Sequence, residues 1–183
     1  MSSRLQLSAL AVLLACCGLE FAPDRPLPPA ATACANPQLP PDILDGPAQR
    51  SAGKPLAVVD VRSDEVTLRL AVAADETARE LGLMCVTRLR PEAGMIFVFD
   101  DDGQEDFWMK NTLVPLDMVW VAADGTVRSI AADVPASTLQ TPDDRVARRS
   151  GLGRYVLELS AGEAQADGIV KGRRLVIPPF KSP

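Results

Sequence analysis

The residues best suited to chemistry gather in one short stretch, Phe107–Thr112, which reads Phe-Trp-Met-Lys-Asn-Thr. An amine, an amide and a hydroxyl follow one another at its end, and Asp117 comes shortly after, two residues beyond Pro115. Such a mixture is typical of a strand that enters a tight, polar turn. Glu158 is a second isolated acid, since it lies inside an apolar strand and must either face solvent or find a partner.

These side chains favour a ligand-binding or interaction site. Trp108 could supply the apolar wall that small-molecule sites usually have. The competing interpretation is structural, because Asn, Thr and Asp side chains often satisfy backbone groups in turns. The candidate ligand-binding residues are Trp108, Lys110, Asn111, Thr112, Asp117 and Glu158.

Two alternatives involve other chemistry. Asp117 and Glu158 could form the carboxyl pair of a hydrolase that acts on envelope glycans, which requires a separation of roughly 5–10 Å. Sulfur ligands could instead bind Cu(I), although methionine more often fills a core. The candidate sulfur ligands are Met84, Cys85, Met95 and Met109. From the sequence we assign no catalytic residue, no resident metal and no cofactor.

The chain of 183 residues contains no histidine, which excludes Ser-His-Asp and Cys-His catalysis and His-ligated metals. Its net charge is −5 and its pI is about 4.8, so we expect no nucleic-acid partner. The expected partners are an unknown small ligand or a component of the envelope, and the expected state is a monomer.

Strand and turn patterns predict the elements that hold these residues. Strands are expected at 56–61, 66–72 and 95–99, with a helix capped by Asp75 between the last two. The run Asp100–Gly103 predicts a hairpin turn to a return strand at 105–109. Further strands are expected at 118–122, 126–130, 155–159 and 174–177, with a short helix over 161–166.

This pattern predicts a mainly β (α+β) fold, a small closed or partly open β-barrel with two short helices in a single globular domain, 56–183. Residues 1–16 resemble a signal peptide that ends in a lipobox at Cys16, and the proline-rich residues 17–55 resemble a disordered linker. The protein is therefore expected to be exported to the periplasm, as a membrane-anchored lipoprotein if Cys16 is lipidated, or after ordinary signal cleavage. Export permits disulfides, and Cys34–Cys85 is one possible pair.

Several motifs occur in the order of a known family: Gly94-Met95-Ile96-Phe97, the Phe107–Thr112 block, Pro115-Leu116-Asp117 and Arg154–Leu159. The chain resembles the bacterial and archaeal domain-of-unknown-function family 192 over residues of about 65–178. The resemblance implies a compact, mainly β domain that is often exported. It implies no activity, substrate or cofactor.

Overall fold

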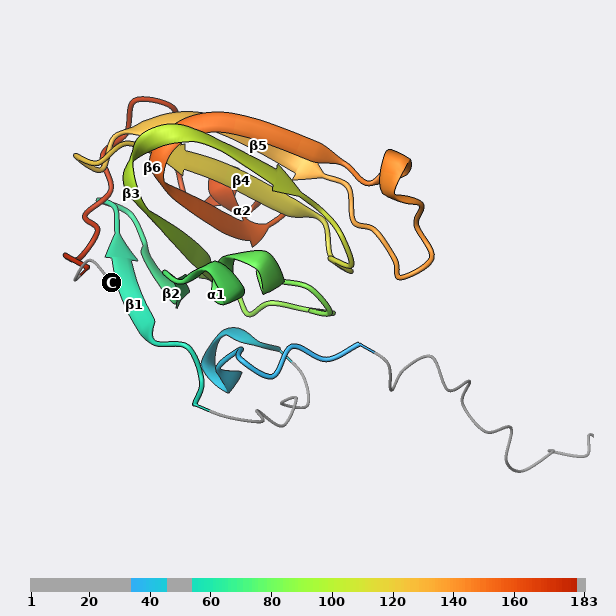
Figure 1. The fold of residues 1–183 in the computed structure, drawn as a ribbon. Helices are drawn as coiled ribbons and strands as arrows, with labels where there is room; N and C mark the ends of the chain where they lie inside the picture. The colour runs from blue at the N-terminus through green and yellow to red at the C-terminus, as the bar shows by residue number, and fades with distance from the viewer. Residues whose placement is uncertain (1–33, 46–53, 181–183) are drawn as a thin grey trace, which may run out of the picture.

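The computed structural model describes residues 34–45 and 54–180, and it is built on one six-stranded sheet (Figure 1). The sheet order is β1-β2-β3-β6-β4-β5, and every neighbouring pair is antiparallel except β2 and β3. The strands are β1 (Val58–Arg62), β2 (Thr67–Ala73), β3 (Ala93–Trp108), β4 (Leu116–Val121), β5 (Val127–Val134) and β6 (Arg148–Ser160).

The two predicted short helices are confirmed as α1 (Glu76–Leu81) and α2 (Glu163–Ala166). Asp75 caps α1, because its Oδ1 accepts a hydrogen bond from the Ala78 amide at 2.9 Å. The helix lies in the crossover between the parallel strands β2 and β3, a connection that such strands require. The described residues also contain the 3-10 turns η2 (Pro41–Ile43) and η3 (Asp143–Arg145). Within the described residues, every helix is too short or too polar to traverse a bilayer.

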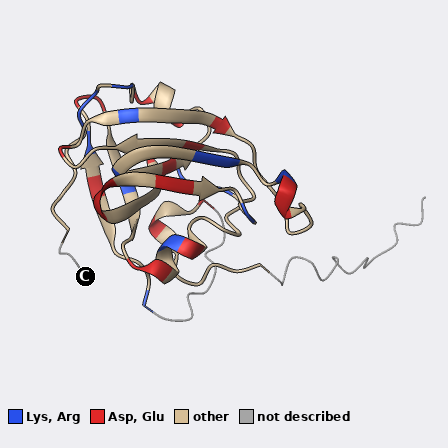
Figure 2. Cartoon of the chain, turned by 45° about the horizontal axis from the view of Figure 1, so that its top comes forward, with Lys and Arg blue, Asp and Glu red and all other residues tan. Residues whose placement is uncertain are grey.

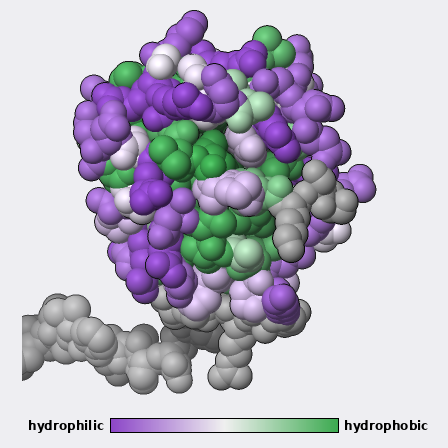
Figure 3. Space-filling model, turned by 90° about the vertical axis from the view of Figure 1, so that its left-hand side faces the viewer, coloured by the Kyte–Doolittle hydropathy of each residue, from purple (hydrophilic) through white to green (hydrophobic). Residues whose placement is uncertain are grey.

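The sheet forms a partly open barrel, which confirms the predicted fold class. Its edges are β1 and β5, and the C-terminal segment links them at one end through bridges from Val176 to Arg62 and from Arg174 to Thr126. Residues 174–177 were predicted to form a strand, but in the structure they form only these two isolated bridges. Seen from the side that carries β1 and the C-terminal segment, apolar side chains occupy the middle of the surface and hydrophilic ones surround them (Figure 3).

The predicted hairpin at Asp100–Gly103 is wrong. β3 continues through these residues and stays paired with β6 on both sides, at Val98–Tyr155 and again at Gly103–Gly153. The aspartates therefore form a bulge, in which extra residues on one strand oppose fewer on its partner and the strand bends without reversing. Arg154 stabilises this bulge by donating a hydrogen bond from Nε to the Phe99 carbonyl at 3.2 Å.

Two apolar layers cover the two faces of the sheet. Side chains alternate along β6, so Val156 belongs to the layer beneath α1, whereas Leu157 and Leu159 belong to the layer that packs on α2. Gly94 allows the close approach of β3 to β6, since a Cβ there would lie 2.1 Å from the Glu158 carbonyl oxygen. This close approach fixes the register between β3 and β6 at Glu158.

Part of the predicted linker is structured. Leu39 and Ile43 are buried in the layer beneath α1. Burial of their apolar side chains stabilises this part of the segment against the domain. The Cys34–Cys85 disulfide, with a Cα–Cα distance of 5.4 Å, ties this segment to the domain and confirms the suggested pairing. The signal peptide, the lipobox at Cys16 and the rest of the linker lie outside the described residues.

Candidate ligand-binding site

A pocket of about 390 Å³ opens between α1, the loop that follows it and the central strands β3 and β6. Its volume falls in the range of small-molecule sites. The residues that line it come from four segments: Glu76, Arg79, Glu80, Leu81, Gly82, Leu83 and Met84 from α1 and its loop, Phe97, Phe99, Glu105, Asp106, Phe107 and Trp108 from β3, Lys110 and Thr112 from the following turn, and Glu158 from β6.

Glu158 is the buried acid of this pocket. It is 4% exposed, and among the residues that the structure describes none donates a hydrogen bond or offers a cation to its carboxyl. Burial raises the pKa of this carboxyl to about 8, because loss of water disfavours the charged form. A buried acid without a partner is costly, and this makes Glu158 the candidate functional group of the pocket.

The sheet register explains why Glu158 faces the pocket. Glu158 pairs with Met95 on one side and with Met118 on the other, so all three side chains leave the same face of the sheet. Both methionines are fully buried and neither can hydrogen-bond strongly to a carboxyl. The acid is thus flanked by apolar side chains and open only toward the pocket.

Three of the candidate residues from the sequence, Trp108, Lys110 and Thr112, also line this pocket. Lys110 Nζ lies 2.7 Å from Asp143 Oδ1 and 5.3 Å from the centre of the Trp108 ring. Thr112 is buried, and its hydroxyl donates to the Lys110 carbonyl at 3.2 Å. The turn therefore places one apolar surface and one neutralised amine beside the opening.

Asn111 and Asp117 lie elsewhere. Asn111 has a left-handed backbone, with φ 53°, and its carbonyl accepts from the Cys85 amide. Both oxygens of Asp117 are used, since Oδ1 accepts from the Asp133 amide at 2.9 Å and Oδ2 from the Ala164 amide at 3.0 Å. For Asp117 the geometry is therefore that of the structural interpretation, in which the side chain satisfies backbone groups, whereas Asn111 contributes through its backbone carbonyl.

Sequence reasoning missed most of the residues that α1 and β3 contribute to the pocket, among them Arg79 and Glu105. Arg79 donates to the carbonyls of Ala74 and Val98, and its guanidinium lies 5.3 Å from the centre of the Phe99 ring. Burial raises the pKa of Glu105, an effect that the charge of Arg79 opposes. The one available signal was the cap-and-charge pattern of α1, which predicts a helix but not the strands that it covers. Acidic and basic residues occur together on this helix (Figure 2).

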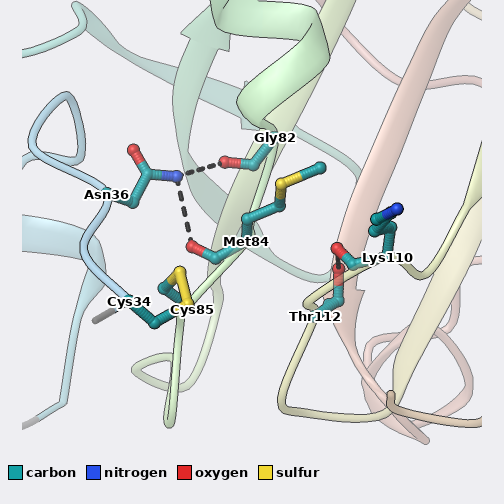
Figure 4. The surroundings of a disulfide bond; sticks show 7 residues. All are labelled: Cys34, Asn36, Gly82, Met84, Cys85, Lys110 and Thr112. Atoms are coloured by element: carbon teal, nitrogen blue, oxygen red, sulfur yellow. Dashed lines mark hydrogen bonds between the residues drawn. A yellow bond between two sulfur atoms is a disulfide. The ribbon is translucent and has the colours of Figure 1, made fainter. Parts of the chain in front are cut away.

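The disulfide lies behind one wall of the pocket (Figure 4). Asn36 Nδ2 donates to the carbonyls of Gly82 at 2.8 Å and of Met84 at 3.3 Å. The Met84 side chain points away from the disulfide, and it lines the pocket. Cys34 and Asn36 thus hold the loop that follows α1 in place from outside.

The fold and the site define a class: a small, partly open β-barrel domain in which a buried carboxyl lines a pocket. A family model matches residues 58–177, that of DUF192, whose description is "Uncharacterized ACR". The chain belongs to this family, which confirms the resemblance seen in its motifs.

Two solved structures are similar to the chain. One, from Sinorhizobium meliloti, is described as a "putative transcription regulator"; it shares 34% identity with a TM-score of 0.58, over 66% of this chain and 94% of its own. The other, from Novosphingobium aromaticivorans, is described as a protein of unknown function; it shares 28% identity with a TM-score of 0.57, over 75% of this chain and 97% of its own. No curated protein matches the chain.

Proposed function

We propose that this protein is a non-catalytic ligand-binding module of the cell envelope and that the pocket around Glu158 is its binding site. The observation that carries the proposal is the Glu158 carboxyl, which is 4% exposed, lines the cavity and has no partner among the described residues. A bound ligand would supply the missing hydrogen bond or charge, and the free energy lost in burying the acid would then be recovered on binding.

The hydrolase alternative depended on Asp117 acting together with Glu158. Met118, and not Asp117, pairs with Glu158 across β4 and β6, so the two acids leave opposite faces of the sheet. Asp117 is also occupied by two backbone amides. This pair therefore gives no support to glycoside hydrolysis.

The Cu(I) alternative depended on Cys85 as a thiolate. Cys85 is bonded to Cys34, so that ligand is absent while the disulfide is intact. Met95 and Met109 are fully buried in the apolar layer, the usual place of methionine as a core residue. We accordingly favour an organic ligand.

Export and lipid anchoring are part of the proposal. The disulfide supports an oxidising compartment, since such bonds are rare in the cytosol. We propose a periplasmic monomer attached to the membrane through a lipid on Cys16. The description of the Sinorhizobium structure suggests a different role, but a net charge of −5 disfavours nucleic-acid binding. Mass spectrometry of the mature N-terminus tests the anchor: an unmodified terminus at another residue would refute it.

The binding site can be tested with a panel of small aromatic amines, alcohols and carboxylates, followed by the indole N–H resonances in NMR. We expect at least one compound to shift the Trp108 signal at a Kd of about 1 mM or below, without an equal change at the buried Trp120. Met84→Phe adds bulk to the pocket wall and should weaken binding, whereas Val170→Phe, at an exposed site outside the pocket, should not. Binding that Met84→Phe leaves intact would place the site elsewhere.

A further inference from the structure

The charges that line the pocket are unequal in number. Besides Glu158, whose raised pKa keeps it mostly protonated at neutral pH in the free protein, the acids are Glu76, Glu80, Glu105 and Asp106, and the bases are Arg79 and Lys110. Such an excess of one sign within a concave, partly apolar surface concentrates ligands of the opposite charge. The pocket as a whole therefore favours cations over anions.

Both basic side chains are already engaged with protein groups. The Arg79 guanidinium donates to two backbone carbonyls, at 2.6 Å and 3.2 Å, and Lys110 forms its ion pair with Asp143. Neither is directed at the Glu158 carboxyl. Arg79 and Lys110 thus stabilise the walls, and the acid at the centre is left for a ligand.

Aromatic rings form the apolar part of the wall. Phe107 packs edge-to-face against Phe97, at 4.8 Å between ring centres, and against Phe99, at 6.4 Å. All three rings line the pocket, and ring faces attract cations. Two rings of the pocket already contact protein cations, since the Arg79 guanidinium lies over Phe99 and the Lys110 amine lies over Trp108.

We propose that the ligand of this pocket is a small organic cation, whose ammonium group meets the Glu158 carboxyl and whose apolar body packs against Phe97, Phe99 and Phe107. This inference rests on the proposed function and names its ligand class. The cavity of about 390 Å³ suits a small molecule and not a polymer. A protein-bound Ca²⁺ usually takes six or more oxygen ligands. Among the described residues, no group of three or more Cys, Asp or Glu side chains is placed to hold a metal ion, so the inferred cation is an organic one.

Three probes of one shape separate the possible outcomes: benzylammonium, benzyl alcohol and benzoate. Calorimetric titration into the full chain should give a Kd for benzylammonium ~10-fold or more below that for benzyl alcohol, because a hydrogen bond to a charged group contributes roughly 1.5–3 kcal/mol. Benzoate should bind most weakly. Glu158→Gln should abolish the preference for the amine, whereas Asp60→Asn, which removes an exposed acid from β1, should retain it.

Circular dichroism of Glu158→Gln would establish that the variant is folded, and Glu105→Gln provides a second variant, with a smaller expected loss. If benzyl alcohol or benzoate binds as tightly as the amine, or if Glu158→Gln keeps the preference, the cation inference is wrong while binding in the pocket stands. If none of the three probes binds, the proposed function fails together with the inference.

Discussion

Asp117 and Glu158 lie on neighbouring strands, one step out of register, and point to opposite faces of the sheet. Asp117 faces the α2 side and is satisfied by two backbone amides, whereas Glu158 faces the pocket and has no protein partner among the described residues. Two buried acids in adjacent strands therefore have different surroundings: Asp117 is bonded to the backbone, and Glu158 faces the pocket in which we propose that a ligand binds.

Replacing Asp117 by alanine should destabilise the protein. The Ala164 amide would lose its acceptor inside the domain, where an unsatisfied buried group costs roughly 1–3 kcal/mol, and the amide of the exposed Asp133 would lose a part-buried hydrogen bond as well. We expect Asp117→Ala to lower the free energy of unfolding by about 2–5 kcal/mol in urea titrations. Asp60→Ala is the matched control at an exposed position and should change it by less than about 0.5 kcal/mol. Equal stability of the two variants would contradict the structural role of Asp117.

Glu158 should make stability fall as the pH rises. Its pKa is raised by burial from 4.5 to about 8, so between these values the folded state holds a proton that the unfolded state has released. The stabilising contribution is complete below the unfolded pKa and is lost as the pH rises through the folded pKa. The slope is at most about 1.4 kcal/mol per pH unit.

Comparison with Glu158→Gln isolates this effect, because the other acids titrate in both proteins. Urea unfolding at about pH 5 and about pH 8 should show that the wild type loses several kcal/mol relative to the variant. A stability difference that stays constant over this interval would mean that Glu158 titrates as an ordinary, solvated acid.

The disulfide should stabilise both the domain and the pocket. It closes a loop with a sequence separation of 51, for which chain entropy predicts a contribution of roughly 4 kcal/mol. Reduction would also weaken the hold of Asn36 on the carbonyls of Gly82 and Met84. We expect dithiothreitol to lower the unfolding midpoint in urea and to weaken benzylammonium binding. The double variant Cys34→Ser, Cys85→Ser should not respond to the reductant, and a wild type that is equally unresponsive would contradict this account.

The sequence predicted most of the sheet because alternation and turn residues are local signals. It also isolated Glu158, since an acid within Tyr155–Leu159 stands out against its apolar neighbours. The hairpin at Asp100–Gly103 was predicted wrongly because a run of Asp and Gly is compatible with a bulge as well as a turn, and only pairing with β6 distinguishes the two.

Most of the pocket lining could not be predicted for a related reason. The position of Arg79 and Glu105 depends on how α1 packs across β3, which is a long-range contact without a local pattern. The faces taken by Asp117 and Glu158 depend on a one-residue register between β4 and β6. The residue types therefore identified the candidate side chains, and the pairing of the strands decided which of these side chains lie on the same face of the sheet.

The most direct test follows the Glu158 carboxyl itself. Its side-chain carbon can be titrated by NMR in the free chain and in the chain saturated with benzylammonium. We predict a pKa of about 8 in the free protein and a fall of roughly one unit or more in the complex, because a bound cation favours the ionised acid. A pKa near the ordinary value of 4.5 in the free chain, or one that benzylammonium leaves unchanged, would contradict a binding site built around Glu158.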